Sequence, residues 1–101
     1  MRVQIDVTKN DIKQGTQQDP ELCAVALRVK KLVKKQYRNS VSVINPIEIG
    51  DYMSNGNKKM DNFIHDFDTL PKDDVKPISF VIDLPMKYLT NKTIADNRIR
   101  N

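Results

Sequence analysis

Six basic side chains are concentrated in one stretch near the middle of the chain, and they are its best candidates for binding chemistry. Residues 20–38 hold six Lys or Arg residues and one acidic residue. On a helix these cations share one face, which attracts phosphate groups or an acidic protein surface. The alternative is a solvated helix face without a ligand, since Lys-rich outer faces are common. The candidate anion-binding residues are Arg28, Lys30, Lys31, Lys34, Lys35 and Arg38.

The other reactive side chains form no convincing catalytic set. His65 is the only histidine, and on a helix Asp61 and Asp68 come within reach of it, as an acid–base or metal pair requires. A single histidine without a second group of ligands argues against a metal site. Cys23 is the only cysteine, and its apolar neighbours favour a buried, inert thiol. We therefore expect no enzyme, no metal and no cofactor.

A long amphipathic helix must hold the basic residues in place. Asp19-Pro20-Glu21 combines a capping residue, a proline suited to the first helical position and an acid in the first turn. We expect this helix to run from Pro20 to about Tyr37, with apolar residues at spacings of three, four and seven on its inner face. Leu27 breaks the pattern, because it lies on the helix face that carries the basic residues.

The segment before this helix predicts a strand followed by a short helical turn. Apolar and polar residues alternate over residues 2–8, which is typical of a half-buried strand. Thr8 and Asp11 have the spacing of a capping box, in which Asp replaces the usual Glu. Gly15 is a natural stop for the turn that they begin.

The second half of the chain predicts one more amphipathic helix and further strands. Residues 40–50 fit either a bent strand or a tight hairpin around Asn45-Pro46. A loop over residues 51–57, a helix over 60–70, a charged linker over 71–76 and a strand over 77–84 follow.

These elements predict an α+β fold: a small, mostly antiparallel sheet of three to four strands with the two amphipathic helices on one face. We expect a single domain over residues 1–85. Residues 86–101 have weak patterning and are expected to form a loosely ordered tail, or to order only with a partner. The expected core residues are Leu22, Val25, Val29, Leu32, Phe63, Ile64 and Phe67.

Composition excludes several classes of protein. The chain has 101 residues and a formal net charge of +4, which fits one small domain. It has no apolar run of about 18 residues, so we expect no membrane span. Its first residues lack the apolar core of a signal peptide, so we expect a cytoplasmic protein. One cysteine cannot form an internal disulfide.

The order of motifs resembles a small uncharacterised family of phage and bacterial proteins. The resemblance spans residues 2–85, and its shared positions are mostly apolar or capping residues, so it implies a fold and no active site. The chain departs from the family pattern at Ala24, at Ile78 and after Pro85. The segments that correspond to the family motifs are Thr8, Ile12 and Gly15, then Asp19 and Cys23, then Phe63-Ile64-His65-Asp66-Phe67-Asp68, then Pro77-Ile78-Ser79-Phe80.

We expect a phage-type, non-catalytic binding protein that antagonises a host defence system. Its partner is expected to be anionic: a nucleotide signal, a nucleic acid or the acidic surface of a host defence protein. The alternative is a structural or accessory phage protein that acts by self-association as a homo-oligomer, with a basic helix that is merely solvated.

Overall fold

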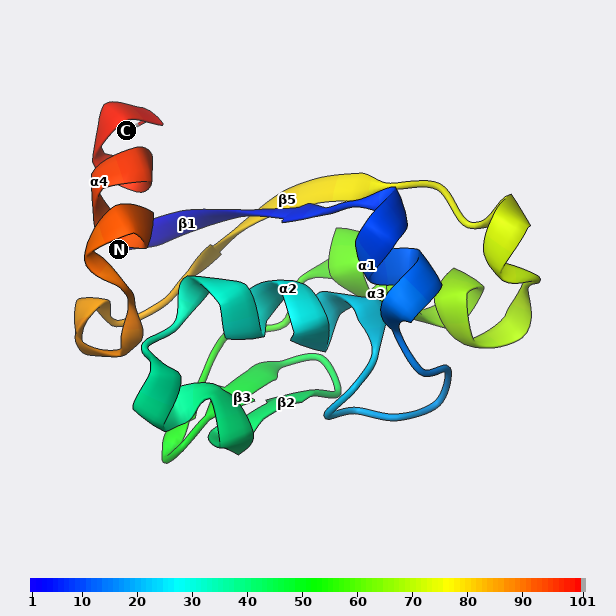
Figure 1. Cartoon of the computed structure of the whole chain (residues 1–101), viewed down its shortest axis with the longest axis horizontal. Coiled ribbons are helices and arrows are strands. Elements are labelled where there is room, and N and C mark those ends of the chain that lie inside the picture. Colours follow the sequence, from blue (N-terminus) through cyan, green and yellow to red (C-terminus); the bar gives the residue numbers. More distant parts are fainter. Residues whose placement is uncertain (101) are drawn as a thin grey trace.

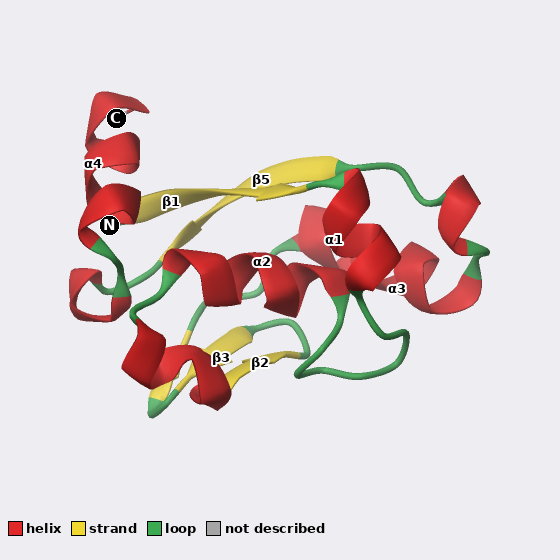
Figure 2. Ribbon diagram, viewed as in Figure 1, coloured by secondary structure: helices red, strands yellow, loops and turns green. Residues whose placement is uncertain are grey.

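The computed structural model describes residues 1–100, and its elements form an α+β architecture, as the sequence predicts (Figures 1 and 2). The α-helices and 3-10 helices (η) are interspersed with short strands along the chain. The elements are β1 (Arg2–Val7), α1 (Lys9–Gln14), α2 (Ala24–Leu32), η1 (Lys35–Ser40), β2 (Val41–Val43), β3 (Ile47–Ile49), β4 (Tyr52–Met53), α3 (Lys58–Thr69), η2 (Lys72–Asp74), β5 (Ile78–Asp83), η3 (Met86–Tyr88) and α4 (Asn91–Arg100).

Strands β1 and β5, which are far apart in the sequence, form an antiparallel pair. Val3 lies opposite Ile82, and Ile5 lies opposite Phe80. All four side chains are buried, while the residues between them are exposed or half-buried. The alternation in the sequence therefore predicted both strands and the face that each turns to the core.

Side chains cover both outer edges of this pair. The Asn97 side-chain oxygen accepts a hydrogen bond from the Gln4 backbone N–H at 2.8 Å. On the other edge, the Tyr52 hydroxyl donates to the Asp83 carbonyl at 2.9 Å. These contacts occupy backbone groups that could otherwise pair with a strand of another chain.

Residues 41–53 form a second antiparallel sheet, in the order β2-β3-β4. Asn45 has a φ of +83°, and the Ile44 N–H donates to the Pro46 carbonyl at 3.1 Å, so the chain reverses tightly between β2 and β3. The hairpin interpretation of residues 40–50 is therefore confirmed. Strand β4 lies inside the segment that we expected to be a loop.

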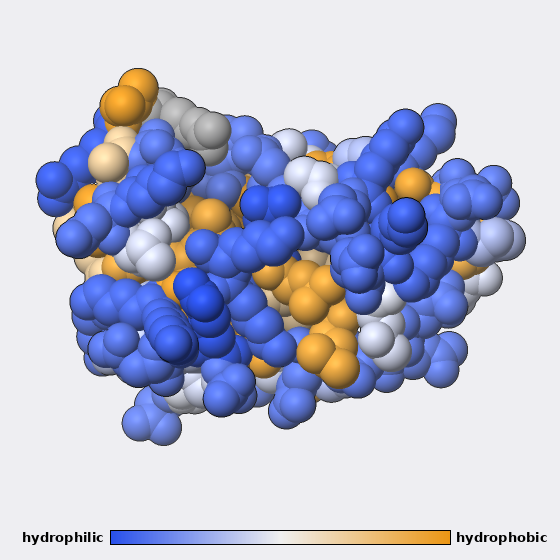
Figure 3. Space-filling view, viewed as in Figure 1, coloured by the Kyte–Doolittle hydropathy of each residue, from blue (hydrophilic) through white to orange (hydrophobic). Residues whose placement is uncertain are grey.

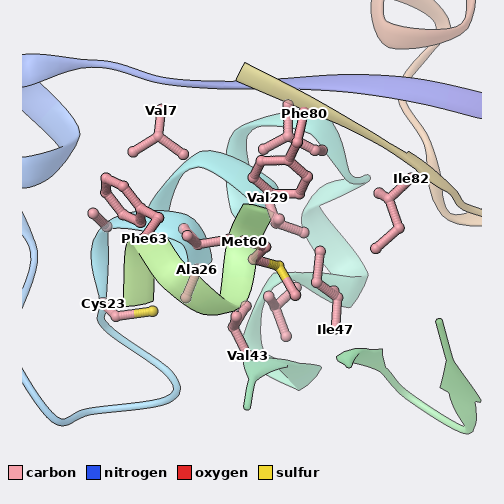
Figure 4. Close-up of a cluster of buried hydrophobic side chains, with 14 of the residues drawn as sticks. Val7, Cys23, Ala26, Val29, Val43, Ile47, Met60, Phe63, Phe80 and Ile82 are labelled. Atoms are coloured by element: carbon pink, nitrogen blue, oxygen red, sulfur yellow. The ribbon is translucent and has the colours of Figure 1, made fainter. Parts of the chain in front are cut away.

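The antiparallel strands are divided between two sheets, where we expected a single sheet. Figure 1 shows α2 between the β1–β5 pair and the β2–β3 hairpin, and α2 contacts both β1 and β2. The reason is that α2 is apolar on more than one side: Ala24, Val25, Ala26 and Val29 are all buried. Side chains from both sheets, α2 and α3 meet in one core (Figure 4).

The helix that we expected to start at Pro20 begins four residues later, at Ala24. Asp19 does cap backbone N–H groups, those of Glu21 and Leu22, but it closes a turn and not a helix. The Pro20 carbonyl accepts a hydrogen bond from Val43 in β2, which holds this turn against the hairpin. Leu22 is consequently 45% exposed, so its assignment to the core was wrong.

The other expected core positions are buried to different degrees. Val25, Val29, Phe63 and Phe67 are buried, as predicted. Leu32 and Ile64 are only partly buried and pack against the core, and these complete the set of expected positions.

Gly15 is required by close packing rather than by its conformational freedom. Its φ of −69° is open to any residue. A Cβ atom at this position would lie 2.7 Å from the Ala24 nitrogen and 3.0 Å from Cζ of Phe67. Gly15 thus lets α1 end directly against α2 and α3.

The segment after Leu84 differs from the loosely ordered tail that we expected. It forms η3 and α4, and Tyr88 and Leu89 are buried. Two polar residues, Thr93 and Asn97, are also buried and hydrogen-bonded, which explains why apolar periodicity did not predict this helix. Of the expected tail, Asn101 lies outside the described residues.

Candidate functional site

The expected helix of residues 20–37 is interrupted in the middle of the basic segment, residues 28–38. Helix α2 ends at Leu32, and Val33 is extended and pairs with Leu89. The Lys34 N–H donates to the Tyr88 carbonyl at 2.7 Å, and the Thr90 N–H donates to the Leu32 carbonyl. These bonds between distant segments prevent the helix from continuing. The six basic residues therefore lie on α2, the break and η1, and not on one helix face.

Arg28 and Lys31 are both directed toward Asp11 in α1. Arg28 Nε lies 2.9 Å from one carboxylate oxygen of Asp11, and Lys31 Nζ lies 3.1 Å from the other. The Asp11 side chain is 0% exposed. The same carboxylate closes the capping box that the sequence predicts, by accepting the Thr8 backbone N–H at 2.9 Å. Asp11 therefore joins α1 to α2 and neutralises part of the positive charge of the basic segment.

The pKa of Asp11 reflects this environment. Burial by itself raises the pKa of the carboxyl group. Hydrogen bonds from the Thr8 backbone and from the Arg28 and Lys31 side chains outweigh burial, so the pKa lies below the usual value of 3.8. Because the folded pKa is depressed, the ionised carboxylate stabilises the fold at pH values above about 4. That stabilisation is lost as the pH falls through the folded pKa.

We predict that Asp11→Asn lowers the free energy of unfolding at pH 7 by about 1.5–3 kcal/mol, since hydrogen bonds to charged groups contribute about this much. Below pH 4 the difference from wild type should shrink, because wild-type Asp11 itself becomes protonated. Urea denaturation at pH 7 and pH 3 measures both effects. The exposed Asp51→Asn is the control. Equal urea midpoints for Asp11→Asn and wild type at pH 7 would contradict the proposed role of Asp11.

The other four candidates are differently placed. Lys35 and Arg38 are exposed on η1, and Lys30 and Lys34 are half-buried. Among residues 1–100, none of these four lies within 4.0 Å of a carboxylate oxygen. Their charges are thus available to a partner.

Three of the six candidate residues line a hollow of about 410 Å³ between α1, α2 and η1. Lys30, Lys31 and Arg38 line it, together with Leu27. Figure 3 shows the face that carries α2: it is mostly hydrophilic, with an apolar patch over α2.

No protein family model, curated protein or solved structure matches this chain. The candidate site is therefore defined by its residues alone.

Asn10, Asp11 and Gln14 of α1 complete the lining of this hollow, and the sequence analysis singled out neither Asn10 nor Gln14 as a site residue. They lie one helical turn apart on α1, so their shared face is visible in the sequence. The sequence gives no sign that this face meets α2, because that contact depends on the tertiary fold.

The second group of candidate residues, around His65, is spread over an exposed face of α3. His65 and Asp61 are exposed, and a carboxylate oxygen of Asp68 accepts the Gln18 backbone N–H at 2.8 Å. Within residues 1–100, no three His, Cys, Asp or Glu side chains are grouped closely enough to hold a metal ion.

We predict that His65→Ala changes the free energy of unfolding by less than about 0.5 kcal/mol and leaves partner binding intact, as is usual for exposed positions. Thermal melting and a binding titration of the variant measure both. Loss of binding in a variant that still folds would show that our dismissal of His65 is wrong.

Cys23 lies at the N-cap of α2 and is buried. Burial raises the pKa of its thiol, and this outweighs the hydrogen bonds from the Ala26 and Val25 backbone that lower it. The thiolate is therefore disfavoured at neutral pH, and the predicted burial of this thiol is confirmed.

Among residues 1–100, no helix combines the length and the apolar character that crossing a membrane requires.

Proposed function

We propose that this chain is a non-catalytic binding protein that engages an anionic partner through its basic segment, residues 28–38. The observation that carries the proposal is the four cations without a carboxylate partner among residues 1–100: Lys30, Lys34, Lys35 and Arg38. Residues 28–38 contain six basic and no acidic residues, and Asp11 is the acid that pairs with this segment. Such a surface speeds the encounter with phosphate groups or acidic proteins.

We further propose that the protein is of the phage type and antagonises a host defence system in the host cytoplasm. This part rests on the resemblance of residues 2–85 to a family of phage and bacterial proteins. The partner is then a defence protein with an acidic surface, or the nucleotide or nucleic acid that such a system uses. Blocking a binding site requires no catalytic residues, in keeping with the dispersed surroundings of His65 and the buried Cys23.

Binding to a model polyanion at increasing salt tests this proposal. Fluorescence anisotropy of a labelled single-stranded oligonucleotide should show binding at low salt that weakens steadily as salt rises, because each phosphate contact releases counterions. Absence of binding to this probe, to nucleoside triphosphates and to a poly-glutamate peptide would refute the proposal.

Self-association is the second candidate function, and exposed apolar residues favour it. Ile44 is 64% exposed beside a hollow of about 370 Å³ that is lined mainly by apolar residues such as Val43 and Ile64. Ile99 on α4 is 87% exposed. Sedimentation at increasing protein concentration tests this function: a constant monomer mass would exclude it.

A further inference from the structure

The hollow between α1, α2 and η1 has a chemical character that a simple polyanion surface does not need. Its cations, Lys30, Lys31 and Arg38, come from two separate elements and face one concave space. Lys31 is held by Asp11 at 3.1 Å, whereas Lys30 and Arg38 have no carboxylate within 4.0 Å among residues 1–100. A flat electrostatic surface requires charge but no cavity.

Leu27 supplies the apolar part of this hollow. It is half-buried on α2, one turn before Lys30 and Lys31, at the point where the sequence pattern placed an apolar residue among the cations. A partly buried leucine side chain offers a surface on which a flat ring can pack and lose contact with water.

Asn10 and Gln14 add hydrogen-bonding groups that carry no charge. Each side-chain amide has one oxygen acceptor and one NH₂ donor, so it can pair with groups of either kind. The edge of a nucleobase presents both donors and acceptors. The Asp11 carboxylate also lines the hollow, but it is paired with Arg28 and Lys31. The hollow therefore combines two cations without a carboxylate partner, an apolar surface and amides within about 410 Å³, a size within the range of small-molecule sites.

We propose that this hollow binds a nucleotide. Arg38 and Lys30 take the phosphate groups, Leu27 packs against the base, and Asn10 and Gln14 contact the edge of the base. The Arg38 guanidinium suits phosphate because its planar group can donate two parallel hydrogen bonds. This inference rests on the proposed function and narrows the anionic partner to a nucleotide unit.

A nucleotide unit can come from two sources: a free nucleotide, or an unpaired nucleotide in a single strand. An acidic protein segment fits the hollow less well, because carboxylate side chains have no flat ring to place on Leu27.

Calorimetric titration compares the four ribonucleoside triphosphates with inorganic tripolyphosphate, which has a similar charge and no base. We expect at least one nucleotide to bind about tenfold more tightly than tripolyphosphate, since burying much of a leucine side chain is worth about one factor of ten or more. Leu27→Asn should remove most of that difference without changing the affinity for tripolyphosphate.

Two single substitutions form a matched pair on η1. Arg38→Gln and Lys35→Gln remove the same charge from the same element, but only Arg38 lines the hollow. Arg38→Gln should weaken nucleotide binding about tenfold, as expected for a charge-assisted contact with phosphate. Lys35→Gln should change it less than about threefold, as a small screened effect of surface charge. Thermal melts confirm that each variant is folded.

The same titrations with a single-stranded oligonucleotide distinguish the two sources. Tight binding of a free triphosphate identifies a free nucleotide. Binding of the oligonucleotide alone, with a larger loss for Arg38→Gln than for Lys35→Gln, identifies a strand. Both outcomes support the inference. Equal affinity for nucleotides and tripolyphosphate, with equal effects of Arg38→Gln and Lys35→Gln, would overturn it and leave the proposed function standing. Binding of a poly-glutamate peptide alone would also overturn the nucleotide inference and keep the proposed function. Absence of binding to every probe would refute the proposed function as well.

Discussion

Phe67→Ala should lower the free energy of unfolding by about 3–5 kcal/mol, the usual cost of deleting a buried phenylalanine ring. Phe67 is 1% exposed on α3 and lies against Gly15, where α1 ends. Its ring also stacks on Phe63, with centroids 6.2 Å apart. The substitution thus leaves a cavity where α1, α2 and α3 meet.

Urea denaturation measures this change, and thermal melting gives a second reading. A domain of this size should lose at least about 12 °C in Tm, and a total stability of about 5–15 kcal/mol brings the variant close to unfolding. The control is Asp66→Ala, the exposed neighbour of Phe67 on the same helix. It should change stability by less than about 0.5 kcal/mol. Equal Tm values for Phe67→Ala and wild type would mean that α3 does not pack as described.

Reversing the charge of Lys30, Lys35 and Arg38 together should weaken binding of a polyanion at least about a hundredfold at low salt. Each reversal removes an attraction and adds a repulsion, and each unit charge contributes about 1 kcal/mol near water at contact distance. Anisotropy with the labelled oligonucleotide measures the loss. These residues, unlike Arg28 and Lys31, have no carboxylate to stabilise within residues 1–100, so the fold should persist.

A matched control changes the net charge equally at another place. Lys58, Lys59 and Lys76 are exposed, and they lie at the start of α3 and before β5. In the same titration repeated at 0.1 M salt, their reversal to Glu should weaken binding far less, because long-range effects are then screened within about 10 Å. An equal loss in both triple variants would show that net charge alone determines binding.

Features that depend on neighbours in sequence were predicted well. The alternation in β1, the capping box of Thr8 and Asp11, and the spacing of Phe63 and Phe67 in α3 all follow from contacts within a few residues. The hairpin over residues 40–50 was one of two alternatives, since its turn signal did not distinguish it from a bend.

Features that depend on distant contacts were missed. The end of α2 is fixed by pairing of residues 32–34 with residues 88–90, which no local pattern announces. Helix α4 buries Thr93 and Asn97 beside the partly buried Ile94, so its inner face is largely polar and has no apolar stripe. The division into two sheets follows from the packing of α2 on both of them.

The candidate site likewise has features that the sequence predicted and features that depend on distant contacts. Composition alone located the basic segment, but it could not show that Asp11 pairs with Arg28 and Lys31, 17 and 20 residues away. Nor could it show that Leu27, the apolar residue among these cations, lies in a hollow with Lys30 and Arg38.

The salt dependence of binding tests the central claim most directly. The logarithm of the oligonucleotide association constant, plotted against the logarithm of salt concentration, should have a wild-type slope of about −3, the value for four neutralised charges on a single strand. The variant with Lys30, Lys35 and Arg38 reversed should have a much shallower slope, because it keeps only Lys34 of the four cations. The variant with Lys58, Lys59 and Lys76 reversed should keep the wild-type slope. Equal slopes for wild type and the first variant would contradict the assignment of anion binding to residues 28–38.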